Sequence, residues 1–173
     1  MGKAAAQELR YGMVGGGPGA FIGDVHRRSI ALDPNTVLAA AAFSRSYEGT
    51  LEIGRGLIMD QERLYRDYGE MAEKESARDD GIDFVVIVTP NVSHFEIART
   101  FLENGIHVVC DKPLTTSLED AEALGKLVSD TGLMFGVTYT YTGYPLVKHA
   151  RAMCLSGELG KIRSLYSTEE ERR

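Results

Sequence analysis

The feature that most constrains the fold of this chain is a regular alternation between short apolar runs and longer segments of helical period. The apolar runs have the length of β-strands, and the most pronounced, residues 82–89, is rich in β-branched side chains and stops at Pro90. Strands that alternate with helices pair in parallel, because each crossover helix returns the chain to the end of the sheet at which the previous strand began. The sequence therefore predicts an α/β domain, a doubly wound parallel sheet. Its strands are expected at residues 11–14, 37–43, 64–65, 82–89, 106–110 and 133–137.

Two of the expected helices carry a recognisable signature in their first turn. Ser93 and Glu96, and again Ser117 and Asp120, have the spacing of a capping box, in which the two side chains bond free backbone amides. Each serine is therefore expected to accept a hydrogen bond from the amide three residues later. The first of these helices should end near Gly105, because glycine adopts the left-handed conformation that closes a helix.

Composition excludes several classes of function. The chain has 173 residues and a net charge of -6, so it lacks the basic surface that nucleic acid or an anionic membrane attracts. No segment has the length and apolarity needed to cross a bilayer, and nothing at the start marks export. Cys110 and Cys154 belong to no Cys/His cluster, so no metal site is indicated, and a reducing cytoplasm is the expected location.

The alternating pattern ends near residue 140. Residues 1–140 are expected to form one domain, and residues 141–173 the truncated start of a second, α+β domain. That second part should hold a linker helix that ends near Ser156 and then a first strand at residues 161–166. The length of the chain agrees with one ordinary domain followed by a fragment of another.

The first expected strand ends in a glycine-rich turn that precedes a helix. Glycines in this position allow a tight turn and let backbone amides approach a pyrophosphate, which the helix N-terminus also attracts. Gly15-x-Gly17-x-x-Ala20 fits the dinucleotide fingerprint of a Rossmann-type sheet. A second register, with Gly23 as the close-packing glycine and a loop three residues longer, fits nearly as well, and the sequence does not choose. The coenzyme-binding residues expected here are Gly15, Gly17, Gly19, Ala20, Phe21 and Ile22.

The end of the second expected strand bears on the choice of coenzyme. NAD-selective domains usually have an acidic residue there, whose carboxylate accepts hydrogen bonds from the ribose hydroxyls. This chain has Ser44 and Arg45 instead. A hydroxyl beside a guanidinium would suit the 2′-phosphate of NADP, although an arginine after a strand is equally well a solvated side chain. Both NAD and NADP therefore stay open.

Two later strands end in polar residues, at the edge where an open α/β sheet binds its ligand. Taken singly, His94 could be an exposed first-turn histidine and Lys112 a solvated strand end. Taken together with the glycine loop, they indicate a nucleotide site. The polar residues are Thr89, Pro90, Asn91 and His94 after one strand, and Asp111, Lys112 and Pro113 after the next.

These motifs together resemble the glucose-fructose oxidoreductase, inositol dehydrogenase and MocA (Gfo/Idh/MocA) family of nicotinamide-dependent oxidoreductases. The resemblance extends over roughly residues 9–167, and it rests on the glycine loop, on Thr-Pro-Asn-x-x-His, and on Asp-Lys-Pro followed by a capped helix. The family usually has Glu-Lys-Pro in the last motif. Asp111 keeps the carboxylate of this motif on a shorter side chain, which reduces its reach.

The resemblance implies a role for each polar residue. Lys112 would lie near the nicotinamide and polarise a substrate hydroxyl or carbonyl, because a cation beside a developing alkoxide stabilises it. Asp111 is the second candidate catalytic residue. Asn91 and His94 would hold the ribose and the nicotinamide, and Pro113 would follow a cis peptide bond.

The resemblance also implies substrates and partners. Family substrates are mostly sugars, cyclitols and their derivatives, and the family's second domain supplies most substrate contacts and the oligomer interface. The expected function is NAD(P)-dependent hydride transfer to or from such a substrate. This chain would be mainly the coenzyme-binding part, inactive alone, of a homo-oligomeric protein. The alternative is a dinucleotide-sensing regulatory protein of the same fold, which catalyses nothing.

Overall fold

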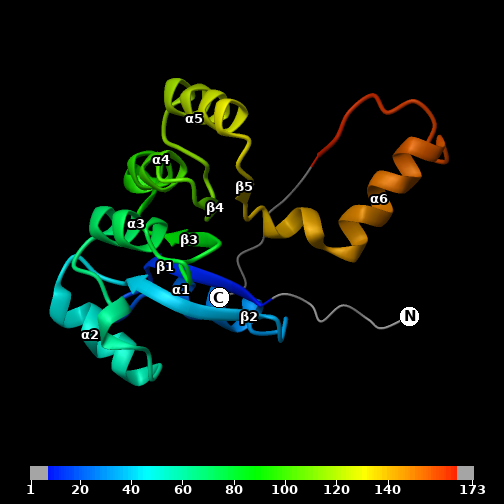
Figure 1. Cartoon of the computed structure of the whole chain (residues 1–173). Helices are drawn as coiled ribbons and strands as arrows, with labels where there is room; N and C mark the ends of the chain where they lie inside the picture. The colour runs from blue at the N-terminus through cyan, green and yellow to red at the C-terminus, as the bar shows by residue number, and fades with distance from the viewer. Residues whose placement is uncertain (1–7, 167–173) are drawn as a thin grey trace, which may run out of the picture. The chain divides into compact units, whose positions relative to one another are not determined.

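The computed structural model describes residues 8–166, and its first unit is an open parallel sheet between two layers of helices (Figure 1). The five strands follow the order β2-β1-β3-β4-β5, and every neighbouring pair is parallel. The order reverses between β1 and β3, which creates the switch point where such sheets bind ligands. The strands are β1 (Leu9–Gly15), β2 (Thr36–Ala42), β3 (Phe84–Val88), β4 (His107–Cys110) and β5 (Phe135–Val137).

One further strand is reduced to a single residue. Leu64 forms a parallel bridge with Ala41 of β2, at the outer side of that strand. Counting this bridge, the sheet has the strand order of a dinucleotide-binding fold, with the third strand of the chain at its edge. The expected strand at residues 64–65 is thus confirmed in its shortest form.

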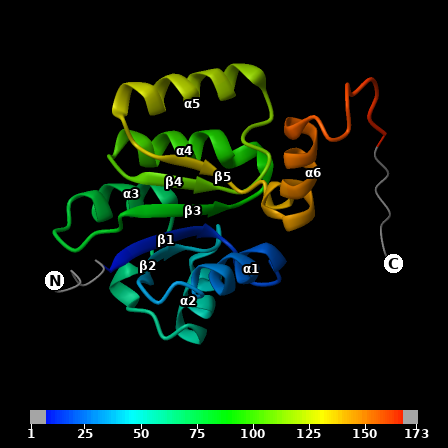
Figure 2. The same ribbon diagram turned by 90° about the vertical axis from the view of Figure 1, so that its right-hand side faces the viewer.

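The helices divide between the two faces of the sheet, as Figure 2 shows. On one face, α3, α4 and α5 bury Met71, Phe101 and Leu124 against the strands. On the other face, Ile22 of α1 and Leu51 of α2 pack on the sheet. Helix bounds are α1 (Phe21–Ile30), α2 (Tyr47–Gly56), α3 (Tyr68–Ser76), α4 (His94–Glu103) and α5 (Leu118–Thr131).

Strand β3 explains why the central runs of the sequence are apolar throughout rather than alternating. Val85 and Ile87 contribute to the core on the α3–α5 side, while Val86 and Val88 contribute to the core on the α1–α2 side. A strand with both faces covered has no solvent face to mark with polar residues. The parallel α/β class predicted from the sequence is therefore confirmed.

The two predicted capping boxes have different outcomes. Ser117 caps α5 as predicted, and its hydroxyl accepts a hydrogen bond from the Asp120 amide at 3.1 Å. The prediction for Ser93 is wrong, because this residue has helical dihedrals and its side chain makes no cap. Its hydroxyl lies 2.8 Å from Thr89 Oγ1 and 2.7 Å from the Pro90 carbonyl instead. A short 3-10 helix, Asn91–Ser93, leads into α4.

The chain divides into its two compact units between Thr138 and Tyr139. The second unit contains a 3-10 helix, Thr140–Gly143, and then α6 (Pro145–Ser156), which ends at Gly157 in the left-handed conformation. The strand expected at residues 161–166 is not formed, because a strand requires a hydrogen-bonded neighbour and residues 8–166 supply none for it. No helix within the described range is long and apolar enough to span a bilayer.

Candidate functional site

The glycine loop between β1 and α1 lies between the ends of β2 and β3, the two strands that flank β1. A Cβ atom on Gly15 would lie 2.7 Å from the carbonyl oxygen of Val88, and one on Gly17 would lie 2.9 Å from that of Phe43. Gly15 and Gly19 also have φ values of 89° and 76°, which favour glycine. The loop therefore follows a path that other residues could not take, across the switch point of the sheet.

The start of α1 is open to an anion. Ala20 occupies the N-cap position with extended dihedrals, and its side chain provides no cap. Helix amides in the first turn need partners from outside the helix, and their dipoles favour a negative charge. Phe21 is 81% exposed, and a Cβ on Gly19 would meet no atom of the described residues within 4 Å, so none of them covers this part of the loop. Of the predicted loop residues, Ile22 is the one whose side chain packs into the core.

The end of β2 brings one of its two candidate residues next to the loop. Ser44 lies beside Gly17, since a Cβ on that glycine would be 3.1 Å from the Ser44 Cβ. The Ser44 amide donates to Thr50 Oγ1 at 3.1 Å, and its hydroxyl accepts from the Ser46 amide at 3.2 Å. Arg45 is exposed, and within residues 8–166 its guanidinium forms no ion pair.

Strand β3 ends in the Thr89–Asn91 segment, which leads into α4. Pro90 and Asn91 are exposed at this edge, and Thr89 is half-buried. His94 is different, because its side chain has no exposed surface at all. Its ring nitrogens lie 3.0 Å from the Thr89 carbonyl oxygen and 2.7 Å from the Pro113 carbonyl oxygen. His94 therefore lies in the protein interior, where it contacts the backbone of both strand ends, and it is not part of the exposed surface of the site.

Strand β4 ends in the Asp111-Lys112-Pro113 turn. The peptide bond before Pro113 is cis, as the resemblance implied, and Lys112 is exposed. Asp111 Oδ1 accepts a hydrogen bond from Thr138 Oγ1 at 2.8 Å and lies 3.7 Å from His26 Nε2. The carboxylate is therefore contacted by residues from two other elements, while the Lys112 ammonium group forms no ion pair with any residue between 8 and 166.

His26 and Thr138 are the two residues at this edge that the sequence did not single out. His26 lies in α1, one turn beyond Gly23, and its side chain is 12% exposed. His26 lies on the same helix face as Gly23, but no pattern in the sequence connects it with Asp111. Thr138 follows β5, and no pattern in the sequence marks it.

The thiol at the end of β4 is buried and has a raised pKa. Cys110 is fully buried, and burial, with a further contribution from the Asp111 carboxylate, raises the pKa of its thiol to about 12. The thiol is therefore protonated at neutral pH, and a protonated thiol is a poor nucleophile.

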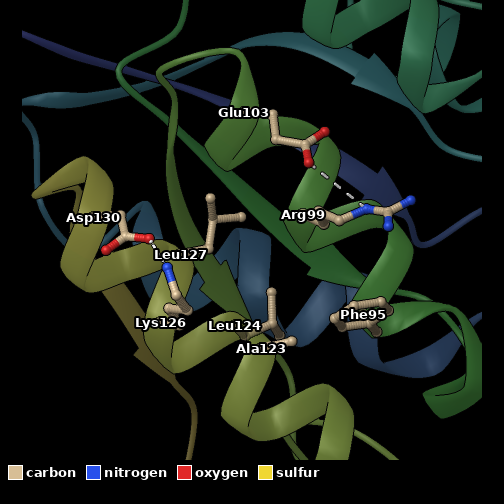
Figure 3. A pocket seen from close by; sticks show the side chains of 8 residues that line it. All are labelled: Phe95, Arg99, Glu103, Ala123, Leu124, Lys126, Leu127 and Asp130. Atoms are coloured by element: carbon tan, nitrogen blue, oxygen red, sulfur yellow. Dashed lines mark hydrogen bonds and ion pairs between the residues drawn. The ribbon is translucent and has the colours of Figure 1, made fainter.

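The structure also has a pocket outside this edge, between α4 and α5 (Figure 3). Its volume is about 250 Å³, and Phe95, Leu124 and Leu127 are among its apolar lining residues. The charged residues around it pair within their own helices, Arg99 with Glu103 and Lys126 with Asp130. None of the residues that line this pocket belongs to the loops at the strand ends.

A parallel sheet with a glycine turn at its switch point and polar strand ends beside it defines a Rossmann-type nucleotide-binding domain. Comparison with known families agrees with that class. The chain belongs to the GFO_IDH_MocA family, described as an oxidoreductase family with an NAD-binding Rossmann fold, which it matches over residues 9–139.

Two curated proteins that match almost the whole of this chain are an oxidoreductase and a dehydrogenase of more than twice its length. The uncharacterized oxidoreductase YfiI of Bacillus subtilis is 39% identical over 163 residues, which are 93% of this chain and 41% of the relative. Levoglucosan dehydrogenase of Pseudarthrobacter phenanthrenivorans is 31% identical over 163 residues, which are 94% of this chain and 41% of that enzyme. The chain therefore spans about two fifths of the length of these relatives.

Among solved structures, an inositol dehydrogenase homolog from Azotobacter vinelandii is 46% identical to this chain, with a TM-score of 0.86. That protein was solved in complex with NAD+, and also in complex with NADH and myo-inositol. The alignment covers 91% of this chain and 41% or 42% of the homolog in the two structures. The likeness is thus again to part of a longer protein.

Proposed function

We propose that this chain is the coenzyme-binding part of an NAD(P)-dependent oxidoreductase that moves hydride between the nicotinamide and a sugar, a cyclitol or a related hydroxyl or carbonyl compound. The chain has the NAD-binding domain of an oxidoreductase family. The observation that carries the proposal is the convergence of two features at one sheet edge. The glycine loop follows β1, and Lys112 follows β4, with only β3 between these two strands.

The residues of the loop fit a dinucleotide. The diphosphate would accept hydrogen bonds from the first amides of α1, which the Ala20 side chain leaves without a cap. Gly19 would let the ligand approach the backbone closely, because a side chain there would narrow that space. A side chain at Gly17 would instead collide with the Phe43 carbonyl, so this glycine lets the loop lie close to the end of β2. Ser44, adjacent to Gly17, would lie beside the adenosine ribose, and Arg45 would reach a 2′-phosphate where one is present.

Lys112 and Asn91 would act at the other end of the coenzyme. When bound there, the nicotinamide ring supplies the carbon that accepts or delivers the hydride. The Lys112 ammonium would donate a hydrogen bond to the substrate oxygen and stabilise the negative charge that develops on it. Asn91, exposed after the neighbouring strand β3, would hold the ribose or the carboxamide through its amide group. Asp111, already bonded to Thr138, would orient the turn that presents Lys112.

The substrate class rests on relatives that this chain matches in part. Levoglucosan dehydrogenase and the inositol dehydrogenase homolog bound to myo-inositol are both named for polyhydroxylated rings. The second unit, from Tyr139 onward, would be the start of the domain that contacts the substrate and other subunits. We accordingly expect this chain to bind coenzyme better than it turns over any substrate.

Titration of the purified chain with NADH and with NADPH tests the proposal. Binding should appear as a change in nicotinamide fluorescence. Coenzyme at one hundred times its dissociation constant should raise the free energy of unfolding by about 2.7 kcal/mol. The absence of both signals, from a chain that unfolds cooperatively, would contradict the proposal. Affinity for NADH alone would favour NAD as the coenzyme, in line with the complex of the Azotobacter homolog.

A further inference from the structure

His94 stands at the point where the two polar strand ends approach each other. It is the first residue of α4, and its side chain is completely buried. Ring atom Nε2 lies 3.0 Å from the carbonyl oxygen of Thr89, at the end of β3. Ring atom Nδ1 lies 2.7 Å from the carbonyl oxygen of Pro113, in the turn after β4. One imidazole therefore joins two loops that are 24 residues apart from Thr89 to Pro113 in the sequence.

Both partners of the ring are carbonyl oxygens, which only accept hydrogen bonds. An imidazolium can donate to both, whereas a neutral imidazole can donate to one of them. Histidine is the one residue type whose small flat ring can offer two hydrogen-bond donors on opposite sides. His94 is thus suited to hold two backbone segments at a fixed separation, which is a different task from binding a ligand.

The turn that carries Lys112 is anchored on both sides of the lysine. On one side, the Asp111 carboxylate accepts from Thr138 Oγ1 at 2.8 Å. On the other side, the Pro113 carbonyl contacts His94. Lys112 itself is exposed between these two anchors. The backbone that carries Lys112 is therefore held in place on both sides of the lysine.

We propose that His94 is a positioning residue that fixes the Lys112 turn against the end of β3, and that it does not contact the coenzyme. This inference rests on the proposed function, because it assigns His94 to the placement of Lys112 in that site. A ring with no exposed surface cannot touch a bound nicotinamide. It can, however, keep the Lys112 ammonium in register with the Thr89–Asn91 segment, where displacement by about 1 Å can cost a hundredfold in rate.

The test compares His94→Leu, which has no donor, with His94→Asn, which keeps an amide donor. The matched control is His107→Leu, at the opposite end of β4, where the ring accepts a hydrogen bond from the Met134 amide at 3.0 Å. Two readouts are needed. Amide hydrogen exchange over residues 107–116 without coenzyme measures the anchoring of the turn. Acetylation by limiting acetic anhydride, followed by mass spectrometry, measures the exposure of Lys112, with Lys126 of α5 as internal reference.

In the wild type and in His107→Leu, saturating NADH should slow acetylation of Lys112 relative to Lys126 by about tenfold, because the bound coenzyme covers the correctly placed ammonium. In His94→Leu this protection should be lost, and exchange over residues 107–116 should be faster by about tenfold, while α5 exchanges as before. His94→Asn should restore part of both. If His94 only filled space in the core, the loss of Lys112 protection would not depend on whether the side chain at position 94 has a hydrogen-bond donor.

Two results would overturn the inference. One is full protection of Lys112 by NADH in a folded His94→Leu variant, with exchange over residues 107–116 unchanged. The other is equal loss of protection in His107→Leu. If His94→Leu does not fold, His94→Ala, which also lacks a donor, takes its place. Failure of the wild-type chain to bind NADH would instead contradict the proposed function, and the exchange experiment without coenzyme would still show whether His94 anchors the turn.

Discussion

Gly23 of α1 packs directly against Gly16 of the glycine loop. A Cβ atom on Gly23 would lie 2.5 Å from the Cα atom of Gly16, a separation at which backbone atoms would have to move. This contact identifies Gly23 as the glycine that lets the helix approach the first strand. The longer of the two registers left open by the sequence is therefore the one adopted, and α1 begins at Phe21.

We predict that Gly23→Ala destabilises the chain and weakens coenzyme binding together. The new methyl group would meet backbone, which cannot rotate away, so a loss of about 1–3 kcal/mol in the free energy of unfolding is expected. NADH affinity should fall by tenfold or about 1.4 kcal/mol, because the loop and the start of α1 shift relative to each other. Chemical unfolding and fluorescence titration measure the two effects.

Gly125→Ala is the matched control for this substitution. Gly125 also lies within a helix, α5, but a Cβ there would meet no atom of residues 8–166 within 4 Å. Replacing it should raise stability by about 0.5–1 kcal/mol, since alanine favours the helix more than glycine does, and should leave NADH affinity unchanged. Equal effects of the two substitutions would show that Gly16 and Gly23 are not in contact.

The sheet was predictable because its signal is local. The β-branched residues of β3 are buried on both faces, and even the single bridge at Leu64 lies in one of the expected strands. The loop register was not predictable, since Ala20 and Gly23 are both small and both fit the spacing of a fingerprint. Only the packing of α1 on Gly16 distinguishes them.

The parts of the site that the sequence missed depend on contacts between distant segments. Ser93 has the spacing of a capping box, but its hydroxyl contacts Thr89 and Pro90 instead of capping α4. The 3-10 helix that precedes α4 brings these residues close to the Ser93 side chain. His26 and Thr138 meet at Asp111 from α1 and from the end of β5. No spacing rule joins residues that come together only when the sheet is assembled.

The second prediction concerns the choice between NAD and NADP. Arg45 follows β2 next to Ser44 and is exposed, so Arg45→Ala should remove a charged partner of a 2′-phosphate without disturbing the fold. Affinity for NADPH should fall about tenfold, or about 1.4 kcal/mol, while affinity for NADH stays the same. Arg55→Ala, in the last turn of α2, is the control. Unchanged binding of both coenzymes by Arg45→Ala would remove the argument for NADP.

The third prediction concerns a buried ion pair beside the outermost strand. The Arg63 guanidinium contacts both carboxylate oxygens of Glu75, and the Tyr65 hydroxyl donates to Glu75 Oε1 at 2.6 Å. Glu75 is 1% exposed, so Glu75→Gln would leave the buried Arg63 guanidinium with the exposed carboxylate of Asp80, 3.7 Å away, as its one acidic partner among the described residues. A loss of about 3 kcal/mol in the free energy of unfolding is expected.

Asp130→Asn provides the comparison, because Asp130 forms an exposed ion pair with Lys126. Exposed pairs contribute about 0–1 kcal/mol, so this substitution should change the free energy of unfolding little. Urea unfolding at neutral pH measures both variants. A Glu75→Gln protein as stable as the Asp130→Asn protein would show that the buried pair contributes no more than a surface one.

The last prediction concerns alkaline pH. Burial raises the pKa of the Cys110 thiol from 9.0 to about 12, so between these values the unfolded chain loses a proton that the folded chain keeps. The contribution of this thiol to the free energy of unfolding is therefore fully present below about pH 9. It decreases as the pH rises further, by about 1.4 kcal/mol per pH unit. Burial and the Glu75 carboxylate also raise the pKa of Tyr65, which adds a loss of the same sign above pH 10.

Cys110→Ala isolates the contribution of the thiol. The variant should be less stable at neutral pH because its smaller side chain leaves space in the core, but its stability should fall less steeply above pH 9. Cys154→Ala, at an exposed thiol of α6, should keep the slope of the wild type. Urea unfolding in the presence of reductant, at pH 7.5, 9.5 and 10.5, measures the three slopes. Parallel slopes in all three proteins would mean that the Cys110 thiol ionises as readily in the folded chain as in the unfolded one.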